Sequence, residues 1–405
     1  MSKRRYQSIK SNWDISRRGF LKVAGGAGLV LGTPGLWAQD QSKRRPPKTV
    51  KTNIDEAMKT PKGKHSLPGA FPGNVVEGDH PAATKKKIIN APAVKEMVTK
   101  GIEGLTGKSL EDSFKLFFNK NDVVGIKVNP VGAGLISTRL EVVDQLVDWL
   151  KKGGIPAKNI IIWDRFDYML KDAGFTPERY PGVGIMGLQT MDEAAAEGKS
   201  KDQSKWMGKD GKHVSEAQFD KDVYYWAEVD GPPDPPYLNQ HVFNGKHSYF
   251  GKLLTQTLTK IINVPVFKNT GNGISMATKN MGYGAVCNTG RLHRPLFFNV
   301  CTEVLAFPAV RDKMVLNVTD GLIGQYDGGP MPVAKFTYNY NRLFFATDPF
   351  ALDMICHNLM VEKRKEMGVK VNEHPRFTEY LRYAEKLGLG VVDSAKLKHR
   401  KITLG

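Results

Sequence analysis

The sequence is poor in cysteine, and this restricts the classes of protein to which it can belong. Three cysteines stand among 405 residues, at Cys287, Cys301 and Cys356. No pair has CxxC spacing, so the chain has no zinc or iron–sulfur motif. Three cysteines are also too few for a disulfide scaffold. One disulfide is possible in an oxidising compartment, but we expect ordinary buried thiols.

Long apolar runs and familiar catalytic motifs are also absent. No stretch approaches the roughly eighteen apolar residues of a membrane-spanning helix. The sequence contains no GxxxxGK[ST], no GxGxxG after a predicted strand, no GxSxG and no HExxH. These absences exclude the P-loop, dinucleotide-binding, serine-hydrolase and zinc-protease classes.

Acidic residues are outnumbered by basic ones, with 41 Asp and Glu against 59 Lys and Arg and a formal net charge of +18. Residues 1–38 hold seven basic groups and one acidic group, and residues 39–87 hold eleven and five. These two segments carry +6 each, so the remainder has the balance of an ordinary enzyme surface and does not favour a nucleic-acid partner. A polyanion-binding module formed by residues 39–87 stays open as an alternative.

The first 38 residues resemble a twin-arginine export signal. The motif runs from Ser16 to Lys22 and contains Arg17 and Arg18, and fourteen uncharged residues follow it. A fourteen-residue helix spans roughly 21 Å, less than the roughly 30 Å of a bilayer core. We therefore expect residues 1–38 to be a signal peptide, with cleavage after Ala38 unsettled. The resemblance implies the twin-arginine translocase as a partner, a periplasmic or otherwise exported location, and no stable membrane anchor in the mature form.

The segment after the signal is predicted to be a tether. Residues 39–87 are rich in Lys and Pro and have almost no periodicity, so we interpret them as an extended tether and then a strap over the body. Their removal should cost little stability, because few apolar groups are lost with them. The folded body is then residues 88–405, within which the polar residues 188–240 form an insertion or lid.

The body shows alternating strand and helix patterns. The run Asp122–Val128 is apolar and β-branched, Thr138–Lys152 places apolar residues on one helical face, and Asn159–Trp163 is apolar again. A strand, a helix and a strand within about forty residues indicate a parallel pair with a right-handed crossover. The predicted fold class is α/β, one large domain with a mostly parallel central sheet, helices on both faces and an irregular insertion.

Other elements follow from the same patterns. Helices are predicted over Ala91–Gly104, from Ser109 to Phe118, near Lys252–Leu258, after Gly273, in turns over Pro295–Arg311, and over Pro349–Met367. Strands are predicted near Val223–Val229 and over Lys260–Phe267, Met314–Val318 and Arg342–Phe345.

Polar residues follow five of the predicted strands. They are Asn129, Asp164, Lys268 with Asn269, Asp320 and Asp348. Ligands of open parallel α/β sheets bind beyond the carboxyl ends of the strands, so we expect these side chains to meet in one solvent-reachable cleft. Alternatively, each is only a helix cap or half of an ion pair.

The candidate residues divide into cations and carboxylates. The candidate lysines, together with the Gly271-Asn272-Gly273 turn that we expect to begin a helix, would bind an anion. The candidate aspartates would instead bind a hard divalent cation. His293, in a Gly-bounded loop, is the best candidate for a general base. We predict catalytic roles for His293, Lys268 and Asp320, substrate contacts for Lys127, Asn129, Asn269, Lys279 and Asn280, and metal ligation by Asp164, Asp320 and Asp348.

The same segments resemble the domain of unknown function 362 family. The motifs are Gly125-Ile126-Lys127-Val128-Asn129, Asn263-Val264-Pro265-Val266-Phe267-Lys268, Ala277-Thr278-Lys279-Asn280-Met281-Gly282, Asp320-Gly321, Gly328-Gly329-Pro330 and Asp348-Pro349-Phe350-Ala351-Leu352-Asp353. They run in order from about residue 88 to 366. The resemblance implies an α/β fold without an agreed activity. Some relatives carry ferredoxin-type cysteine runs, which this chain lacks.

Three functions are compatible with these observations. The first is an exported enzyme that binds an anionic small molecule at the carboxyl edge of its sheet, with or without a divalent metal. The second is a noncatalytic periplasmic binding or accessory protein that uses the same cleft. The third is the polyanion-binding module of residues 39–87.

Overall fold

A computed structural model describes residues 50–191, 206–229, 242–243, 245–293 and 296–405. The chain divides into two compact units, residues 1–45 and 46–405, and the fold described here is that of the second unit. The predicted signal peptide lies outside the described residues. Within the described part, no helix has the length and apolar character needed to cross a membrane.

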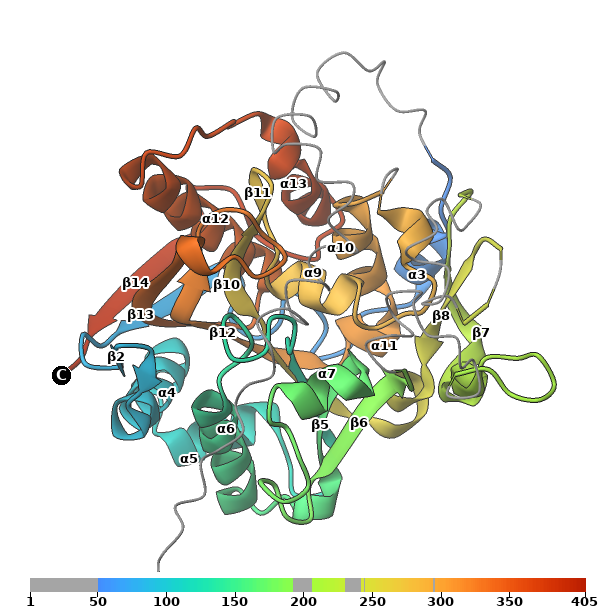
Figure 1. The fold of residues 1–405 in the computed structure, drawn as a ribbon, viewed down its shortest axis with the longest axis horizontal. Coiled ribbons are helices and arrows are strands. Elements are labelled where there is room, and N and C mark those ends of the chain that lie inside the picture. Colours follow the sequence, from blue (N-terminus) through green and yellow to red (C-terminus); the bar gives the residue numbers. More distant parts are fainter. Residues whose placement is uncertain (1–49, 192–205, 230–241, 244, 294–295) are drawn as a thin grey trace, which may run out of the picture. The chain divides into compact units, whose positions relative to one another are not determined.

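A sheet of ten strands forms the centre of the described structure (Figure 1). Its main path runs in the order β14, β1, β13, β12, β9, β4, β5 and β6. The bounds along this path are Lys398–Thr403, Asn74–Asp79, Thr337–Ala346, Met314–Gln325, Lys260–Val264, Val124–Val128, Ile160–Phe166 and Gly184–Gln189. Strand β10 (Val266–Thr270) pairs with β12 and with β11 (Gly273–Ile274). Strands β12, β9, β4, β5 and β6 are mutually parallel, whereas β13 runs antiparallel to both β12 and β1.

Helices cover both faces of the sheet. Alternate residues of a strand point to opposite faces, and the apolar residues of the central strands therefore need cover on both sides. On β5, Ile160 and Ile162 join the cluster under α4 (Ala91–Thr106), α5 (Leu110–Phe117) and α6 (Leu140–Lys152). Ile161 and Trp163 join the cluster on the other face. The other α-helices of the described residues are α3 (Ile54–Lys59), α7 (Asp167–Asp172), α9 (Ala277–Gly282), α10 (Asn299–Glu303), α11 (Pro308–Arg311), α12 (Pro349–Glu366) and α13 (Glu379–Lys386). The predicted α/β fold with a mostly parallel sheet is confirmed.

The segment before residue 88 differs from the expected tether. Residues 74–79 form β1, which lies between β13 and β14 and is almost entirely buried. The fully buried guanidinium of Arg311 holds residues 57–61 by donating to the carbonyls of Ala57, Thr60 and Pro61. The folded unit therefore starts well before residue 88. The short apolar stretch Val75-Val76 was too brief to stand out in a basic, proline-rich context.

The predicted strand over Lys260–Phe267 is two strands. Pro265 separates β9 from β10, because proline cannot donate a ladder hydrogen bond and turns the chain here. Strand β9 then pairs with β4, and β10 pairs with the extended second half of β12. This step carries Lys268 beyond the level at which β4 ends.

One strand of a described hairpin lies within the predicted insertion, and the other follows it. Strands β7 (Phe219–Trp226) and β8 (His247–Gly251) pair antiparallel. A separate small hairpin, outside the insertion, pairs β2 (Thr84–Lys85) with β3 (Ile88–Ile89). Much of the predicted insertion or lid, residues 192–205 and 230–240, lies outside the described residues. The helix expected near Lys252 is a single π turn over Leu253–Thr257.

Candidate functional site

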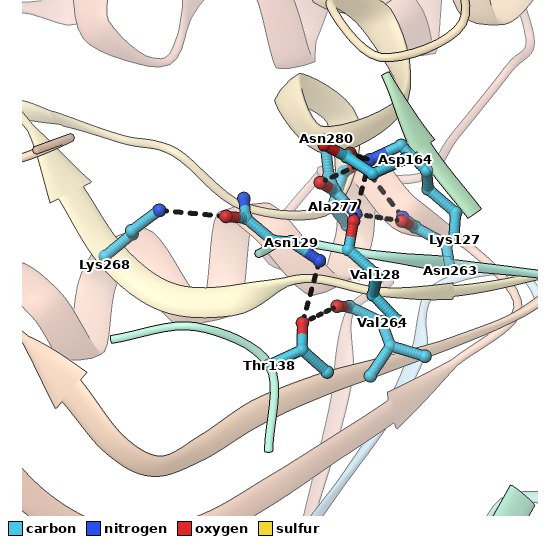
Figure 2. A network of polar contacts seen from close by, with 10 residues as sticks. All are labelled: Lys127, Val128, Asn129, Thr138, Asp164, Asn263, Val264, Lys268, Ala277 and Asn280. Carbon is cyan, nitrogen blue, oxygen red and sulfur yellow. Dashed lines mark hydrogen bonds and ion pairs between the residues drawn. The ribbon is translucent and has the colours of Figure 1, made fainter. Parts of the chain in front are cut away.

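Lys127 lies at the centre of a buried polar network where β4, β5 and α9 meet (Figure 2). Its ammonium group forms an ion pair with Asp164 of β5. It also donates to the side-chain oxygen of Asn280 at 3.0 Å and to the carbonyl of Val128 at 2.8 Å. Burial lowers the pKa of Lys127, and the Asp164 carboxylate acts in the opposite direction. Gly284 permits this packing, since a Cβ there would lie 2.5 Å from the Lys127 side chain.

Two asparagines extend the network across the sheet. The amide of Asn280 donates to Asn263 at 2.8 Å, and Asn263 donates to Asn317 at 2.9 Å and to the carbonyl of Ala277 at 3.0 Å. Sequence reasoning missed both Asn263 and Asn317, although each interrupts an apolar strand run. Both are fully buried, so this chain of amides fixes α9 against β9 and β12.

Lys268 lies on the other side of Asn129 and has a different environment. It donates to the side-chain oxygen of Asn129 at 3.1 Å (Figure 2). Within the described residues, no carboxylate lies at ion-pair distance from it, although it is only 1% exposed. Burial, with the nearby charges of Lys279 and Lys127, lowers the pKa of Lys268 to about 7, while Asp164 acts in the opposite direction.

Asn129 is held in place by the start of α6. Its backbone N–H donates to the hydroxyl of Thr138 at 2.8 Å, and that hydroxyl donates to the carbonyl of Val264. The side-chain oxygen of Asn129 accepts from Lys268, and the NH2 group lies next to this oxygen on the same amide (Figure 2). In the described part of the chain this NH2 group has no acceptor. An unused amide donor therefore lies beside the Lys268 ammonium group.

Lys279 is the half-buried member of the set. Its ammonium group lies 3.3 Å from the hydroxyl of Ser275 and faces two rings, at 5.4 Å from the centre of Tyr283 and 5.3 Å from that of Phe297. Desolvation lowers the pKa of Lys279. The backbone N–H of Ser275 donates to the carbonyl of Lys268, so one residue connects the two lysines.

His293 lies next to this aromatic pair. Its Nδ1 is 3.0 Å from the carbonyl of Thr289, and its ring centre is 4.7 Å from that of Tyr283. Burial and the charges of Lys279 and Arg165 lower the pKa of His293 to about 3. Such an imidazole is neutral at pH 7 but is a weak base. The structure places His293 beside the cations, and its predicted role as a general base stays a prediction.

Arg165 was not predicted from the sequence. It follows Asp164 on β5, is buried, and donates to Gln189 at 2.6 Å and to the hydroxyl of Thr289. Burial lowers the pKa of Arg165 to about 10. The sequence signal for Arg165 is its position directly after Asp164 at the end of an apolar strand. A role was predicted from the sequence for Asp164 alone.

The other predicted carboxylates do not join this network. Asp320 accepts from the backbone N–H groups of Arg139 at 2.6 Å and Leu322 at 3.0 Å, so it holds the start of α6. Burial raises its pKa to about 6. Asp164, Asp320 and Asp348 have separate partners, and the described residues contain no group of three or more metal-ligating side chains. The expected shared metal site is therefore not supported by their placement.

Asp348 corrects the idea of five strand ends at one edge. It follows β13, and since β13 is antiparallel to β12, its carboxyl end points away from the edge where β4, β5 and β9 end. Its carboxylate caps α12 through Phe350 and Ala351 and also accepts from Gly73 and Val391. Burial raises the pKa of Asp348 to about 7.

The Gly271–Gly273 turn also differs from expectation. It connects β10 to β11 and does not open a helix. The side chain of Asn269 spans this turn, donating to the carbonyl of Gly271 and accepting from the N–H of Gly329 at 3.0 Å. Asn269 therefore shapes two loops. Helix α9, which follows later, is capped by Asp353 through the N–H groups of Ala277 and Thr278.

The expectation of a solvent-reachable cleft is wrong for the residues named. The exposed fractions of Lys127, Lys268, Asp164 and Asp320 are 1%, 1%, 6% and 0%. Backbone carbonyls and asparagine amides satisfy part of this polar surface internally, which allows the strand ends to be buried. The structure brings together Lys127, Asn129, Asp164, Lys268, Lys279, Asn280 and His293, and leaves Asn269, Asp320 and Asp348 with local structural partners.

Comparison with known proteins places this network within a recognised family. No curated protein and no solved structure matches the chain. A family model described as "Domain of unknown function (DUF362)" matches residues 124–358. That range is more than half of the chain and contains every residue of the network. The chain belongs to the DUF362 family.

Proposed function

We propose that the protein binds an anionic small molecule, of the carboxylate or phosphate class, beside Lys268 and Lys279. The observation that carries this proposal is an excess of donors. The Lys268 ammonium group has three N–H bonds and one acceptor, and the Asn129 NH2 group beside it has none among the described residues. Neighbouring donors without partners in the described chain are available to an acceptor from outside it.

Charge supports the same conclusion. Lys127, Lys268 and Lys279 act electrostatically within one region, and Asp164 is the one carboxylate in ion-pair contact with them in the described part. A buried cation without a counterion costs several kcal/mol. A bound carboxylate or phosphate would supply the missing negative charge and the missing acceptors together.

Catalysis is the activity that the Lys268 pKa supports. A group with a pKa of about 7 exists in both protonation states near neutral pH, which suits a general acid or base. Lys127, paired with Asp164, would orient the anion. The proposed role of Lys268 is proton transfer to or from the bound molecule, with Lys279 at the half-buried side as the first contact.

Binding of simple anions tests the proposal. Calorimetry with sulfate, inorganic phosphate and oxalate should detect a site in the full chain that weakens about 5- to 150-fold in Lys268→Met, the range for one charge-assisted hydrogen bond. Lys313→Met is the control, because Lys313 is a half-buried lysine that donates to a carbonyl, that of Leu254, elsewhere in the fold. Equal anion affinity in wild type and Lys268→Met would contradict the proposal.

A noncatalytic binding or accessory protein is the second candidate. The low basicity of His293 favours it, because the network then holds no strong partner base for Lys268. The two candidates differ in turnover. If an anionic ligand is bound and recovered unchanged at every pH from 6 to 9, the noncatalytic function is the correct one.

Export is proposed on the sequence motif alone. If Arg17 and Arg18 are read by the twin-arginine translocase, replacing both with Lys should leave folded precursor in the cytoplasm. Fractionation and immunoblotting measure this. An unchanged yield of the exported form from the double Lys variant would rule out the route.

A further inference from the structure

Strand β14 forms one margin of the central sheet. It pairs in parallel with β1 along residues 398–403 and is the last strand of the order (Figure 1). Among the described residues, nothing pairs with its other side. All its residues are exposed except the half-buried Ile402, so a row of backbone donors and acceptors faces outward.

The register identifies the outward-facing groups. The N–H of Lys398 donates to Gly73, and that of Leu404 donates to Asp79, both on the β1 side. Backbone groups of a parallel strand alternate between its two neighbours, so the even-numbered residues from 398 to 404 bond to β1. The N–H and C=O groups of His399, Lys401 and Thr403 therefore point to the open side.

The same edge is strongly basic. Strand β14 begins Lys398-His399-Arg400-Lys401, and no acidic residue occurs from position 394 to 405. Lys401 and His399 face Asp79 and Glu77 of β1. Lys398 and Arg400 have no carboxylate at ion-pair distance in the described part of the structure. Two of the three Lys and Arg side chains of β14 are therefore available to a partner.

A groove of about 500 Å³ continues this basic surface onto the neighbouring helices. Arg400 and Ile402 of β14 form one side, and Lys100 and Lys108 come from the end of α4 and the turn after it. Glu103 is the one carboxylate among the described lining residues, and it pairs with Lys100. The groove thus has three cations and one anion.

We propose that the β14 edge and this groove bind an extended acidic segment of a partner protein, which adds to the sheet as a further strand. The outward backbone groups would supply ladder hydrogen bonds, and alternate acidic side chains would meet Lys398, Arg400 and Lys108. Edge lysines also protect sheets from nonspecific pairing. That protection does not require Lys108, which lies off the strand and adds its charge to the same groove.

A labelled peptide tests the proposal with the full chain. The probe is fluorescein-Glu-Val-Glu-Val-Glu-Val-Glu, and the same peptide with Lys for Glu is its control. Fluorescence anisotropy should show binding of the acidic probe alone. Lys398→Glu combined with Arg400→Glu, and separately Lys108→Glu, should weaken binding at least tenfold. Melting curves check that these exposed substitutions leave the fold intact.

A backbone variant separates strand addition from simple charge attraction. Thr403→Pro removes one outward N–H without changing charge or the bonds to β1, and should weaken peptide binding about tenfold, whereas Thr403→Val should not. If Thr403→Pro binds the peptide like wild type, the surface attracts polyanions through charge alone and the proposal is wrong. If the acidic probe does not bind, the charges serve only to keep the edge unpaired, which also overturns it.

Discussion

Lys127 and Lys268 are two buried lysines whose partners give them opposite effects on stability. Lys127 neutralises Asp164, whereas Lys268 has an asparagine oxygen as its acceptor. Removing one member of a buried ion pair leaves an uncompensated charge and costs about 3–5 kcal/mol. Replacing an unpaired buried charge by an apolar group removes a desolvation penalty that no Coulombic attraction offsets, so it should not be destabilising. The second case is typical of a residue kept for function.

We therefore predict that Lys127→Met lowers the free energy of unfolding by about 3–5 kcal/mol, whereas Lys268→Met leaves it unchanged or raises it. Urea denaturation of both variants at pH 7 measures the difference. Asp164→Asn combined with Lys127→Met should recover part of the loss, because the orphaned carboxylate is gone. Equal destabilisation by both lysine variants would show that Lys268 has a structural counterion.

The pKa of Lys268 also predicts two opposite responses to pH. In the folded protein this pKa is about 7, against about 10.4 in an unfolded chain. Between these values the unfolded state binds more protons, so stability relative to Lys268→Met should rise from pH 7 to 9, by at most about 1.4 kcal/mol per pH unit. Below pH 7 both states are protonated and the difference should be flat.

Anion binding should change in the other direction. As pH rises above 7, Lys268 loses its charge and sulfate affinity should fall. Sulfate is the suitable probe because its own charge is constant over this range. Lys268→Arg, which stays protonated, should remove the fall. A sulfate affinity that is independent of pH in wild type would exclude Lys268 as the titrating contact.

At the residue scale, the sequence predicted which residues form the polar network better than it predicted how buried they are. Lys127, Asn129, Asp164 and Lys268 follow apolar runs and were found for that reason. Their burial was not predictable from local patterns, because the partners come from distant parts of the chain. Asn280 accepts from Lys127 across 153 residues, and Asn129 accepts from Lys268 across 139.

At the element scale, patterns with local causes were predicted and strand direction was not. The unit β4–α6–β5 and the Asp348 cap of α12 follow from periodicity and capping rules. The antiparallel direction of β13 depends on the path of the chain between Gln325 and Thr337, which no local pattern encodes. This direction is why Asp348 became a structural residue.

The carboxylate of Asp348 joins three segments of the chain. We therefore predict that replacing it lowers the free energy of unfolding by more than the loss of an ordinary helix cap. One carboxylate oxygen accepts from Phe350 and Ala351, and the other accepts from Gly73 and Val391. In Asp348→Asn the oxygen can still cap α12, but the NH2 group would face two backbone donors. We expect a loss of about 2–4 kcal/mol, because two buried donors become unsatisfied.

Ser109→Ala is the matched control for this prediction. Ser109 caps the exposed start of α5 through Asp112 alone, and such a cap contributes about 1 kcal/mol. Urea denaturation compares the two variants. A cost for Asp348→Asn no larger than that for Ser109→Ala would show that the link to Gly73 and Val391 adds nothing.

At the scale of the whole molecule, the composition and the structure divide the basic N-terminal segment differently. The composition of residues 39–87 predicted a tether outside the fold. Residues 50–87 belong to the folded unit, since β1 gives β13 and β14 a common neighbour and residues 57–61 satisfy Arg311. We therefore expect that removing residues 39–87 lowers the stability of the fold, contrary to the prediction from the sequence. Their charge lies on a structural segment, and a binding experiment with that deletion would confuse lost charge with lost folding.

Two truncations separate these effects. A chain lacking residues 1–49 should retain a cooperative melting transition, because β1 and the carbonyl partners of Arg311 remain. A chain lacking residues 1–87 should be insoluble or should melt without cooperativity, because β13 loses the strand paired with residues 342–345, β14 loses its only described neighbour, and the fully buried Arg311 loses three acceptors. Calorimetry of the two chains at equal concentration measures this, and similar melting of both would show that the sheet from β13 to β6 is stable without β1.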